Sequence, residues 1–222
     1  MKKQINEILK ELKKHSSQKN IKGMERFGIT SKKKFGVPMP VLRKMAKHIG
    51  KNHELALKLY PLGYHDTRLL ASFIEIPEKV TKQQMDKWVN GFESWADCDS
   101  ICGALLDKVP GAREKAYSYI KSKKEFVKRA GFVIITWQAV HDKMVGDKVF
   151  IDFLDIIERE SHDERNFIKK AVNWSLRTIG KRNERLRKLA IKKAREIEKQ
   201  NSKPAKWIAK NALRELENYR FK

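Results

Sequence analysis

The sequence Phe126-Val127-Lys128-Arg129 returns twice in altered form, as Phe167-Ile168-Lys169-Lys170 and as Trp207-Ile208-Ala209-Lys210. The first two copies start 41 residues apart and the last two start 40 residues apart. Each copy begins with two large apolar residues and has a basic residue at its fourth position. A period near 40 residues is typical of proteins built from stacked helix pairs. The repeat therefore predicts an array of helix pairs.

The fourth position of the repeat is expected to form a row of positive charge. Residues at the same phase of successive repeats project from the same face of the stack, so Arg129, Lys170 and Lys210 should lie about one repeat apart on that face. Such a row suits the regularly spaced phosphates of a nucleic acid.

Helical periodicity also dominates the rest of the chain, which lacks the alternating apolar pattern and the tight hairpin turns of strands. Thr81 and Asp66 are expected to cap helices, as is Ser161 or Asp163, whereas residues 20–39 are expected to be irregular. The expected helices cover residues 3–14, 40–51, 53–62, 66–77, 81–90, 95–108, 111–121, 124–140, 146–160, 163–180, 182–200 and 203–220.

Short connections between these helices predict that neighbours pack antiparallel. The expected fold is all-α, a HEAT-like α-solenoid of stacked antiparallel helix pairs that is curved and has a basic concave face. No low-complexity linker divides the chain, so residues 1–222 are expected to form a single domain.

The formal net charge of +23 is concentrated at the two ends of the chain. Residues 1–51 contain 15 lysines and arginines against 3 acids, and residues 163–222 contain 19 against 7, whereas residues 52–162 are nearly balanced, with 16 against 17. Basic surfaces attract polyanions through counterion release, so we expect a nucleic-acid partner held by two basic arms. The alternative is a charge excess that only keeps the protein in solution.

The sequence gives no indication of a membrane span, a secretory signal, a metal site or a phosphate-binding glycine loop. Its two cysteines, Cys98 and Cys102, lie one helical turn apart, where they cannot join two elements or form a zinc site. We therefore expect a cytoplasmic protein with no metal, no membrane partner and no small-molecule cofactor.

Two positions four residues apart, Trp95 and Asp99, would share one face of a helix. An indole ring beside a carboxylate suits a cation, because the carboxylate attracts positive charge and the ring face adds a cation–π interaction. The alternative is that Trp95 packs in the core and that Asp97 or Asp99 sits in the first helical turn, where the helix dipole favours an acid.

A third tryptophan position, Trp174, lies off the apolar stripe of its helix and shares a face with Lys170, Arg177 and Thr178. Core packing does not explain this placement, which indicates a stacking or cation-facing side chain on a phosphate-binding surface. The alternative is a contact with the neighbouring repeat. The other tryptophans, Trp88, Trp137 and Trp207, are expected in the core.

These motifs together resemble the AlkD-like DNA alkylation repair family. The matching residues are Trp95-x-x-x-Asp99-Ser100, Arg129 within Phe-Val-Lys-Arg-Ala, Lys170-Ala-x-x-Trp174-x-Leu-Arg177 and, upstream, Gly36-Val37-Pro38-x-Pro40-x-Leu42-Arg43. The resemblance runs from about residue 25 to residue 215, and this chain departs from the family pattern at Ala96-Asp97-Cys98.

The resemblance implies a monomeric DNA glycosylase that excises positively charged N3- or N7-alkylated purines from duplex DNA without a cofactor. Asp99 would be the catalytic carboxylate, with Trp95 and Trp174 as the aromatic pair facing the lesion and its deoxyribose. The DNA-binding residues would be Arg129, Lys170, Arg177 and Lys181. Two alternatives stay open, namely a non-catalytic module for branched DNA or structured RNA and a protein-interaction scaffold.

Overall fold

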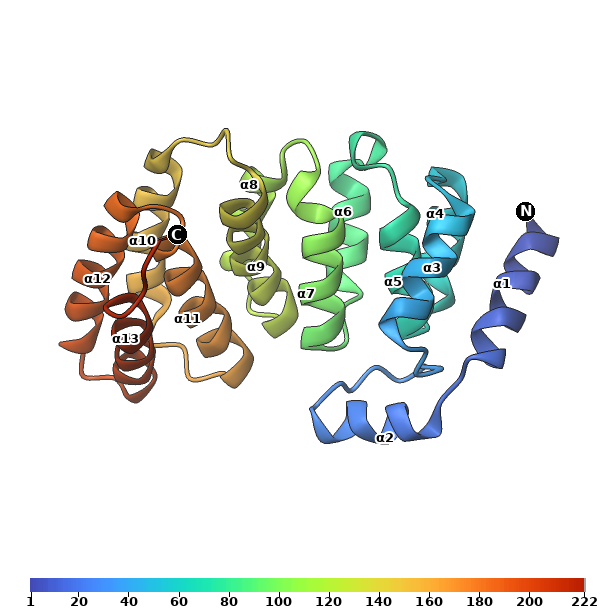
Figure 1. Ribbon diagram of the computed structural model, residues 1–222, viewed down its shortest axis with the longest axis horizontal. Coiled ribbons are helices and arrows are strands. Elements are labelled where there is room, and N and C mark those ends of the chain that lie inside the picture. Colours follow the sequence, from blue (N-terminus) through green and yellow to red (C-terminus); the bar gives the residue numbers. More distant parts are fainter. Residues whose placement is uncertain (222) are drawn as a thin grey trace. The chain divides into compact units, whose positions relative to one another are not determined.

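The computed structural model describes residues 1–221, and within them it is helical (Figure 1). The α-helices are α1 (Lys2–Lys14), α2 (Gln18–Arg26), α3 (Met39–Ile49), α4 (His53–Leu59), α5 (His65–Ile74), α6 (Lys82–Asn90), α7 (Trp95–Ala104), α8 (Ala112–Ile120), α9 (Glu125–His141), α10 (Asp147–Glu160), α11 (Asn166–Gly180), α12 (Glu184–Glu198) and α13 (Lys203–Leu216). Three short 3-10 helices, η1 (Tyr60–Leu62), η2 (Pro77–Lys79) and η3 (Leu106–Lys108), complete the described elements. The expected all-α class is confirmed.

The chain divides into two compact units, Met1–Lys115 and Ala116–Lys222. In the first unit α5 is the central helix, because it packs against α3, α4 and α7 and has nine buried residues. In the second unit α9, α11 and α13 pack in succession, with α10 and α12 behind them. Two compact halves are compatible with one repeat array or with two domains, so the single domain over residues 1–222 stays a prediction.

The sequence repeat corresponds to a structural repeat in the second unit. Its three copies lie in the first turn or two of α9, α11 and α13. The rings of Phe126 and Phe167 are in contact, with centroids 5.5 Å apart, and the ammonium of Lys169 lies 4.9 Å from the ring centre of Trp207. Consecutive copies therefore touch one another, as a stacked array requires.

Most helix boundaries agree with the sequence patterns, and Thr81 caps α6 by accepting a hydrogen bond from the backbone N–H of Gln84. The expectation of an irregular segment over residues 20–39 is wrong over its first part. There Ser17 accepts a hydrogen bond from the N–H of Asn20 and starts α2. A single side-chain cap was enough to begin this short helix.

The expected helix caps at Asp66 and at Ser161 or Asp163 are wrong. Asp66 lies inside the first turn of α5, and its carboxylate instead accepts the backbone N–H groups of Phe35 and Val37 at 2.7 Å and 2.8 Å. Helix α11 starts at Asn166 without a side-chain cap, because Asp163 is occupied by ion pairs with Lys128 and Arg165.

The tryptophans expected in the core divide between the interior and the surface. Trp88 is buried, with 2% of its surface exposed, and its ring stacks on Tyr60 at a centroid distance of 4.1 Å. Trp207 is 37% exposed and Trp137 is half-buried, so the core placement of these two is wrong. The ammonium of Lys169 lies over the Trp207 ring, and the Trp137 ring contacts those of His141 and Trp174.

Candidate functional site

Helix α7 has two aspartates near its start, Asp97 in the first turn and Asp99 just after it, in very different environments. Ser94 caps the helix by accepting the backbone N–H of Asp97 at 3.3 Å, so α7 begins at Trp95. The side chain of Asp97 is fully buried, whereas Asp99, two residues further along, is only half-buried. Residue spacing on the helix causes this difference, because Asp97 points toward α5 and Asp99 shares the face of Trp95.

Asp97 is the centre of a buried polar network. The Nδ1–H of His65 donates to its Oδ1 at 2.5 Å, and the hydroxyl of Ser31 and the backbone N–H of Glu93 donate to its Oδ2 at 3.1 Å and 3.2 Å. The guanidinium of Arg68 lies 3.5 Å from Oδ2 and also pairs with Glu93 at 2.9 Å. This network joins α5, α7 and the segment before α3, and so Asp97 has a structural role.

The pKa of Asp97 reflects these contacts. Burial alone would raise it, but the hydrogen bond and the charge of His65, the charge of Arg68 and the Glu93 N–H together hold the pKa below its ordinary value of 3.8. The carboxylate therefore stays ionised inside the protein at neutral pH.

Trp95 and Asp99 are the two sequence-predicted site residues that lie in the first unit. Both are half-buried, and both project from the same side of α7, four residues apart. The indole N–H of Trp95 donates to the backbone carbonyl of Phe27 at 3.0 Å, which fixes the ring at the end of α2. The helix therefore puts the aromatic ring and the carboxylate on one face of α7, and their roles at a lesion stay predictions.

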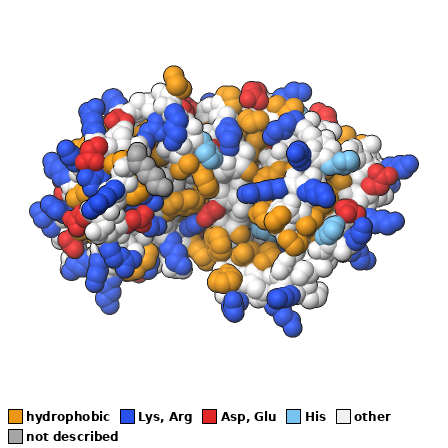
Figure 2. Space-filling view, viewed as in Figure 1, with side chains coloured by type: hydrophobic (Ala, Val, Ile, Leu, Met, Phe, Trp, Pro, Cys, Tyr) orange, Lys and Arg blue, Asp and Glu red, His pale blue; other side chains and the backbone are white. Residues whose placement is uncertain are grey.

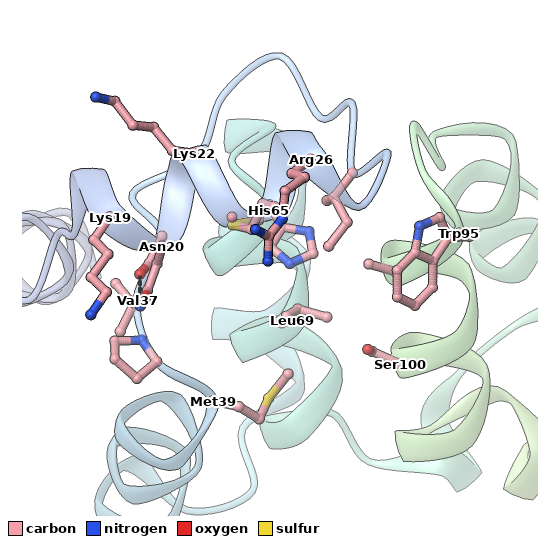
Figure 3. Close-up of a pocket in the computed structure, with 16 residues that line it drawn as sticks. Lys19, Asn20, Lys22, Arg26, Val37, Met39, His65, Leu69, Trp95 and Ser100 are labelled. Atoms are coloured by element: carbon pink, nitrogen blue, oxygen red, sulfur yellow. Dashed lines mark hydrogen bonds between the residues drawn. The ribbon is translucent and has the colours of Figure 1, made fainter.

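A cavity of about 790 Å³ adjoins this face (Figure 3). Helices α2, α3, α5 and α7 contribute its walls, and Trp95, Ala96 and Ser100 form the α7 side. His65 also lines the cavity, and its Nδ1 is held by Asp97. The buried Asp97 network thus supports one wall of the cavity.

The second unit contains the other predicted aromatic residue. Trp174 on α11 is half-buried, and its ring meets that of Trp137 edge to face, with centroids 5.5 Å apart and an interplanar angle of 85°. Trp137 in turn stacks on His141 at 4.9 Å. Trp174 therefore contacts the neighbouring repeat, the alternative given for it, and still keeps part of its ring exposed.

The four predicted DNA-binding cations of the second unit differ in accessibility. Lys170 is exposed. Arg177 and Lys181 both pair with Glu215 of α13, Lys181 at 2.6 Å. Arg129 is only 5% exposed, and its guanidinium donates to the backbone carbonyl of Phe167 at 2.5 Å. A side chain buried to this degree offers little surface to a phosphate, so the direct DNA contact of Arg129 stays a prediction.

Figure 2 shows basic side chains scattered over the surface of both units, and hydrophobic side chains gathered above α2. No helix within residues 1–221 is both long and apolar enough to span a membrane. In the same residues, no three His, Cys, Asp or Glu side chains form a group suited to holding a metal ion.

Sequence reasoning missed several residues of these sites. His65 contacts Asp97, which lies 32 residues further along the chain. Glu215 contacts Arg177 and Lys181, each more than 30 residues away in sequence. One signal was available for Trp137, since it is followed four residues later by His141, which a helix places on the same side.

Comparison with known proteins gives two bacterial relatives that are themselves uncharacterised. The chain is 25% identical over 168 residues to Lin0241, an uncharacterised protein of Listeria innocua, covering 74% of this chain and 73% of the relative. It is 24% identical over the same length to Lmo0209, an uncharacterised protein of Listeria monocytogenes, with the same coverage.

A solved structure from "a new family of proteins related to the HEAT-like repeat DNA glycosylases with affinity for branched DNA structures" also matches. Its TM-score is 0.78 at 22% identity, and the match covers 95% of this chain and 94% of that one. This likeness shows that the helical fold is of the HEAT-like type.

The model of the family described as DNA alkylation repair enzyme matches residues 8–216, which is nearly the whole chain. This range includes Trp95, Asp99, Arg129 and Trp174, the residues on which the resemblance was based. The protein therefore belongs to the DNA alkylation repair enzyme family.

Proposed function

We propose that this protein is a DNA glycosylase that excises positively charged N3- or N7-alkylated purines from duplex DNA. The observation that carries the proposal is that Trp95 and Asp99 lie on one partly exposed face of α7. The neighbouring Asp97 lies on another side of the helix, buried in its hydrogen-bond network. Membership of the DNA alkylation repair family supports it.

The chemistry fits these side chains. A purine that is already cationic is a good leaving group, so the reaction needs no strong general acid. As the glycosidic bond lengthens, positive charge develops on the deoxyribose, and the Asp99 carboxylate and the Trp95 ring face stabilise that charge. One well-placed electrostatic group of this kind contributes about 3 kcal/mol, or roughly a hundredfold in rate.

The bond changes balance without a cofactor. The water oxygen, oriented by Asp99, forms a bond to the anomeric carbon while the bond from that carbon to the purine nitrogen breaks. The bonding electron pair leaves with the base and neutralises its charge, and the water proton passes to Asp99 or to solvent.

The second unit supplies the remaining proposed contacts. Trp174 provides a second aromatic face, and Lys170, Arg177 and Lys181 hold the phosphate backbone together with Arg129. We further propose that the protein acts as a cytoplasmic monomer without a cofactor.

Release of 7-methylguanine and 3-methyladenine from alkylated duplex DNA tests this function. We expect release by the wild type and a loss of about a hundredfold in rate for Asp99→Asn. Asp152→Asn is the matched control, because it makes the same change at an exposed residue of α10 that pairs with Lys148 of its own helix. No release by the wild type would contradict the proposal, and equal rates for wild type and Asp99→Asn would remove Asp99 from its role.

A second candidate is a non-catalytic module that binds branched DNA. The observation in its favour is that the similar solved structure comes from a family with affinity for branched DNA. This function needs no carboxylate at position 99, since an acid near phosphates only repels them. Unchanged affinity of Asp99→Asn for a four-way junction, together with no base release by the wild type, would favour it over excision.

A further inference from the structure

The apolar side chains of helix α2 are only partly covered by protein. None of its nine residues is buried, although Ile21, Met24 and the following Ile29 are apolar. Gly23, Met24 and Ile29 instead line the cavity of about 790 Å³ that α2 forms with α3, α5 and α7. Here this cavity is called the α2 cavity. A ligand that covers apolar side chains in an open cavity removes them from water, and this burial contributes favourable free energy to binding.

Gly23 lies in the interior of α2, where a glycine costs about 1 kcal/mol relative to alanine. Neither backbone nor packing explains the glycine, because its φ is not positive and a Cβ built there meets no atom within 4 Å. That missing side chain borders the α2 cavity. The residue therefore keeps space at the cavity that a bulky side chain would fill.

The walls of the cavity are held in place before any ligand binds. The N–H of Ser17 donates to the carbonyl of Phe35 at 3.0 Å, and the amide of Asn20 donates to the carbonyl of Gly36 at 2.9 Å. Gly36 has φ 71°, and a Cβ there would approach Ile21 and Ser17 to 2.8 Å. Asp66 fixes the same segment through Phe35 and Val37. A cavity with fixed walls binds a ligand with little loss of conformational entropy in the protein.

The polar groups of the cavity favour an anion. Lys19, Lys22 and Arg26 line it from α2, all of them exposed, and none of the sixteen lining residues that the structure describes is acidic. Positions 19, 22 and 26 lie on one face of a helix. Figure 3 shows the Lys22 ammonium extending away from the cavity, so Lys19 and Arg26 are the better placed cations within it.

Aromatic surface is available beside these cations. Trp95 forms the α7 side of the cavity, and its hydrogen bond to Phe27 fixes the plane of its ring. Phe27 itself is 65% exposed at the end of α2, with Arg26 lying 5.1 Å from its ring centre. A flat base stacks on such rings, and every nucleobase has a face that can do so.

We propose that the α2 cavity binds one unpaired nucleotide of a DNA strand. The base lies against Trp95 and Met24, and its flanking phosphates contact Lys19 and Arg26. The occupant is part of a strand rather than a free nucleotide, because the Lys22 ammonium extends away from the cavity, where it can contact a phosphate further along the strand. This binding shares Trp95 with the proposed excision site but does not require the excision reaction.

The test compares two DNA duplexes that differ by one bulged 2-aminopurine nucleotide. Fluorescence anisotropy gives the affinity for each duplex, and 2-aminopurine emission reports stacking on the bulged base. We expect the wild type to bind the bulged duplex at least about tenfold more tightly, which corresponds to one stacked base. Emission should fall as the base stacks on Trp95.

Gly23→Phe fills the cavity and should abolish the preference for the bulged duplex, while binding to the paired duplex is unchanged. Gly23→Ala is the matched control, since it occupies little of the cavity and strengthens the helix, and it should keep the preference. Lys19→Glu is a second variant at an exposed position that leaves folding intact, and it should also remove the preference.

Three outcomes would overturn the proposal. They are equal affinity of the wild type for both duplexes, a preference that survives Gly23→Phe, and saturation of the cavity by free deoxyadenosine monophosphate without any preference for the bulge. Release of alkylated bases is measured separately on fully paired DNA, so a failure of excision leaves this result unaffected.

Discussion

The indole N–H of Trp95 donates a hydrogen bond to the backbone carbonyl of Phe27, joining α7 to the end of α2 across 68 residues of sequence. This bond gives Trp95 a fixed orientation, which both the proposed excision and the α2 cavity require. It also means that a substitution at Trp95 changes two things, the aromatic surface and the attachment of α2.

Trp95→Phe separates these two contributions. The variant keeps an aromatic face but loses a hydrogen bond worth about 1 kcal/mol, so the amides of α2 should exchange with solvent several-fold faster. Base release should fall by less than for Trp95→Ala, which removes the ring as well. Hydrogen exchange of residues 18–26 and single-turnover release rates measure the two effects, and unchanged exchange in Trp95→Phe would show that the bond does not hold α2.

Asp97→Asn is expected to destabilise the protein. Replacing the buried carboxylate leaves the Arg68 guanidinium poorly compensated and weakens the hydrogen bond from His65, and breaking such a buried pair costs about 3 kcal/mol. Urea unfolding measures the loss. Asp99→Asn is the comparison, because its effect is expected mainly on base release, and a larger loss of stability for Asp99→Asn than for Asp97→Asn would contradict these assignments.

Acid should destabilise the fold of the first unit by protonating Asp97. The pKa of Asp97 is lower in the folded protein than its ordinary value of 3.8, so its contribution is complete above that value and is lost as the pH falls toward the lowered folded pKa. The difference in unfolding free energy between wild type and Asp97→Asn should therefore shrink on acidification below about pH 4. A constant difference from pH 7 to pH 3 would exclude this linkage.

Glu215→Gln is expected to strengthen binding to DNA. Glu215 pairs with both Arg177 and Lys181, and its removal leaves two cations without their acid. The slope of log affinity against log salt concentration should become steeper by about one unit. Glu198→Gln, at an exposed residue of α12, makes the same charge change away from this pair, and an equal gain there would mean that only net charge matters.

Gly131→Ala tests the packing of the repeats. A Cβ on Gly131 of α9 would lie 2.6 Å from the carbonyl oxygen of Ala116 and from Ile120 of α8, so the two helices would have to separate. Overpacking of this kind costs about 1–3 kcal/mol. Gly23→Ala, where a Cβ meets nothing, should instead stabilise by up to about 1 kcal/mol, and calorimetry of both variants should give shifts of opposite sign.

Features that depend on local periodicity could be predicted from the sequence alone. The 40-residue repeat predicted the packing of α9, α11 and α13, because apolar residues at a fixed phase have to be buried against the neighbouring copy. The spacing of four residues placed Trp95 and Asp99 on one face of α7 for the same reason. The family resemblance rested on these local motifs and is confirmed over residues 8–216.

Which polar groups are buried and which remain accessible became clear only from the contacts between helices that are distant in the sequence. Asp97 is fixed by Ser31 and His65, whose distance in sequence gives no periodic signal. Trp207 has the repeat phase of a core residue, yet it is 37% exposed, because no further repeat among the described residues covers the face of the last copy. Burial and charge pairing depend on side chains that come together from distant helices, and a pattern along one helix cannot contain that information.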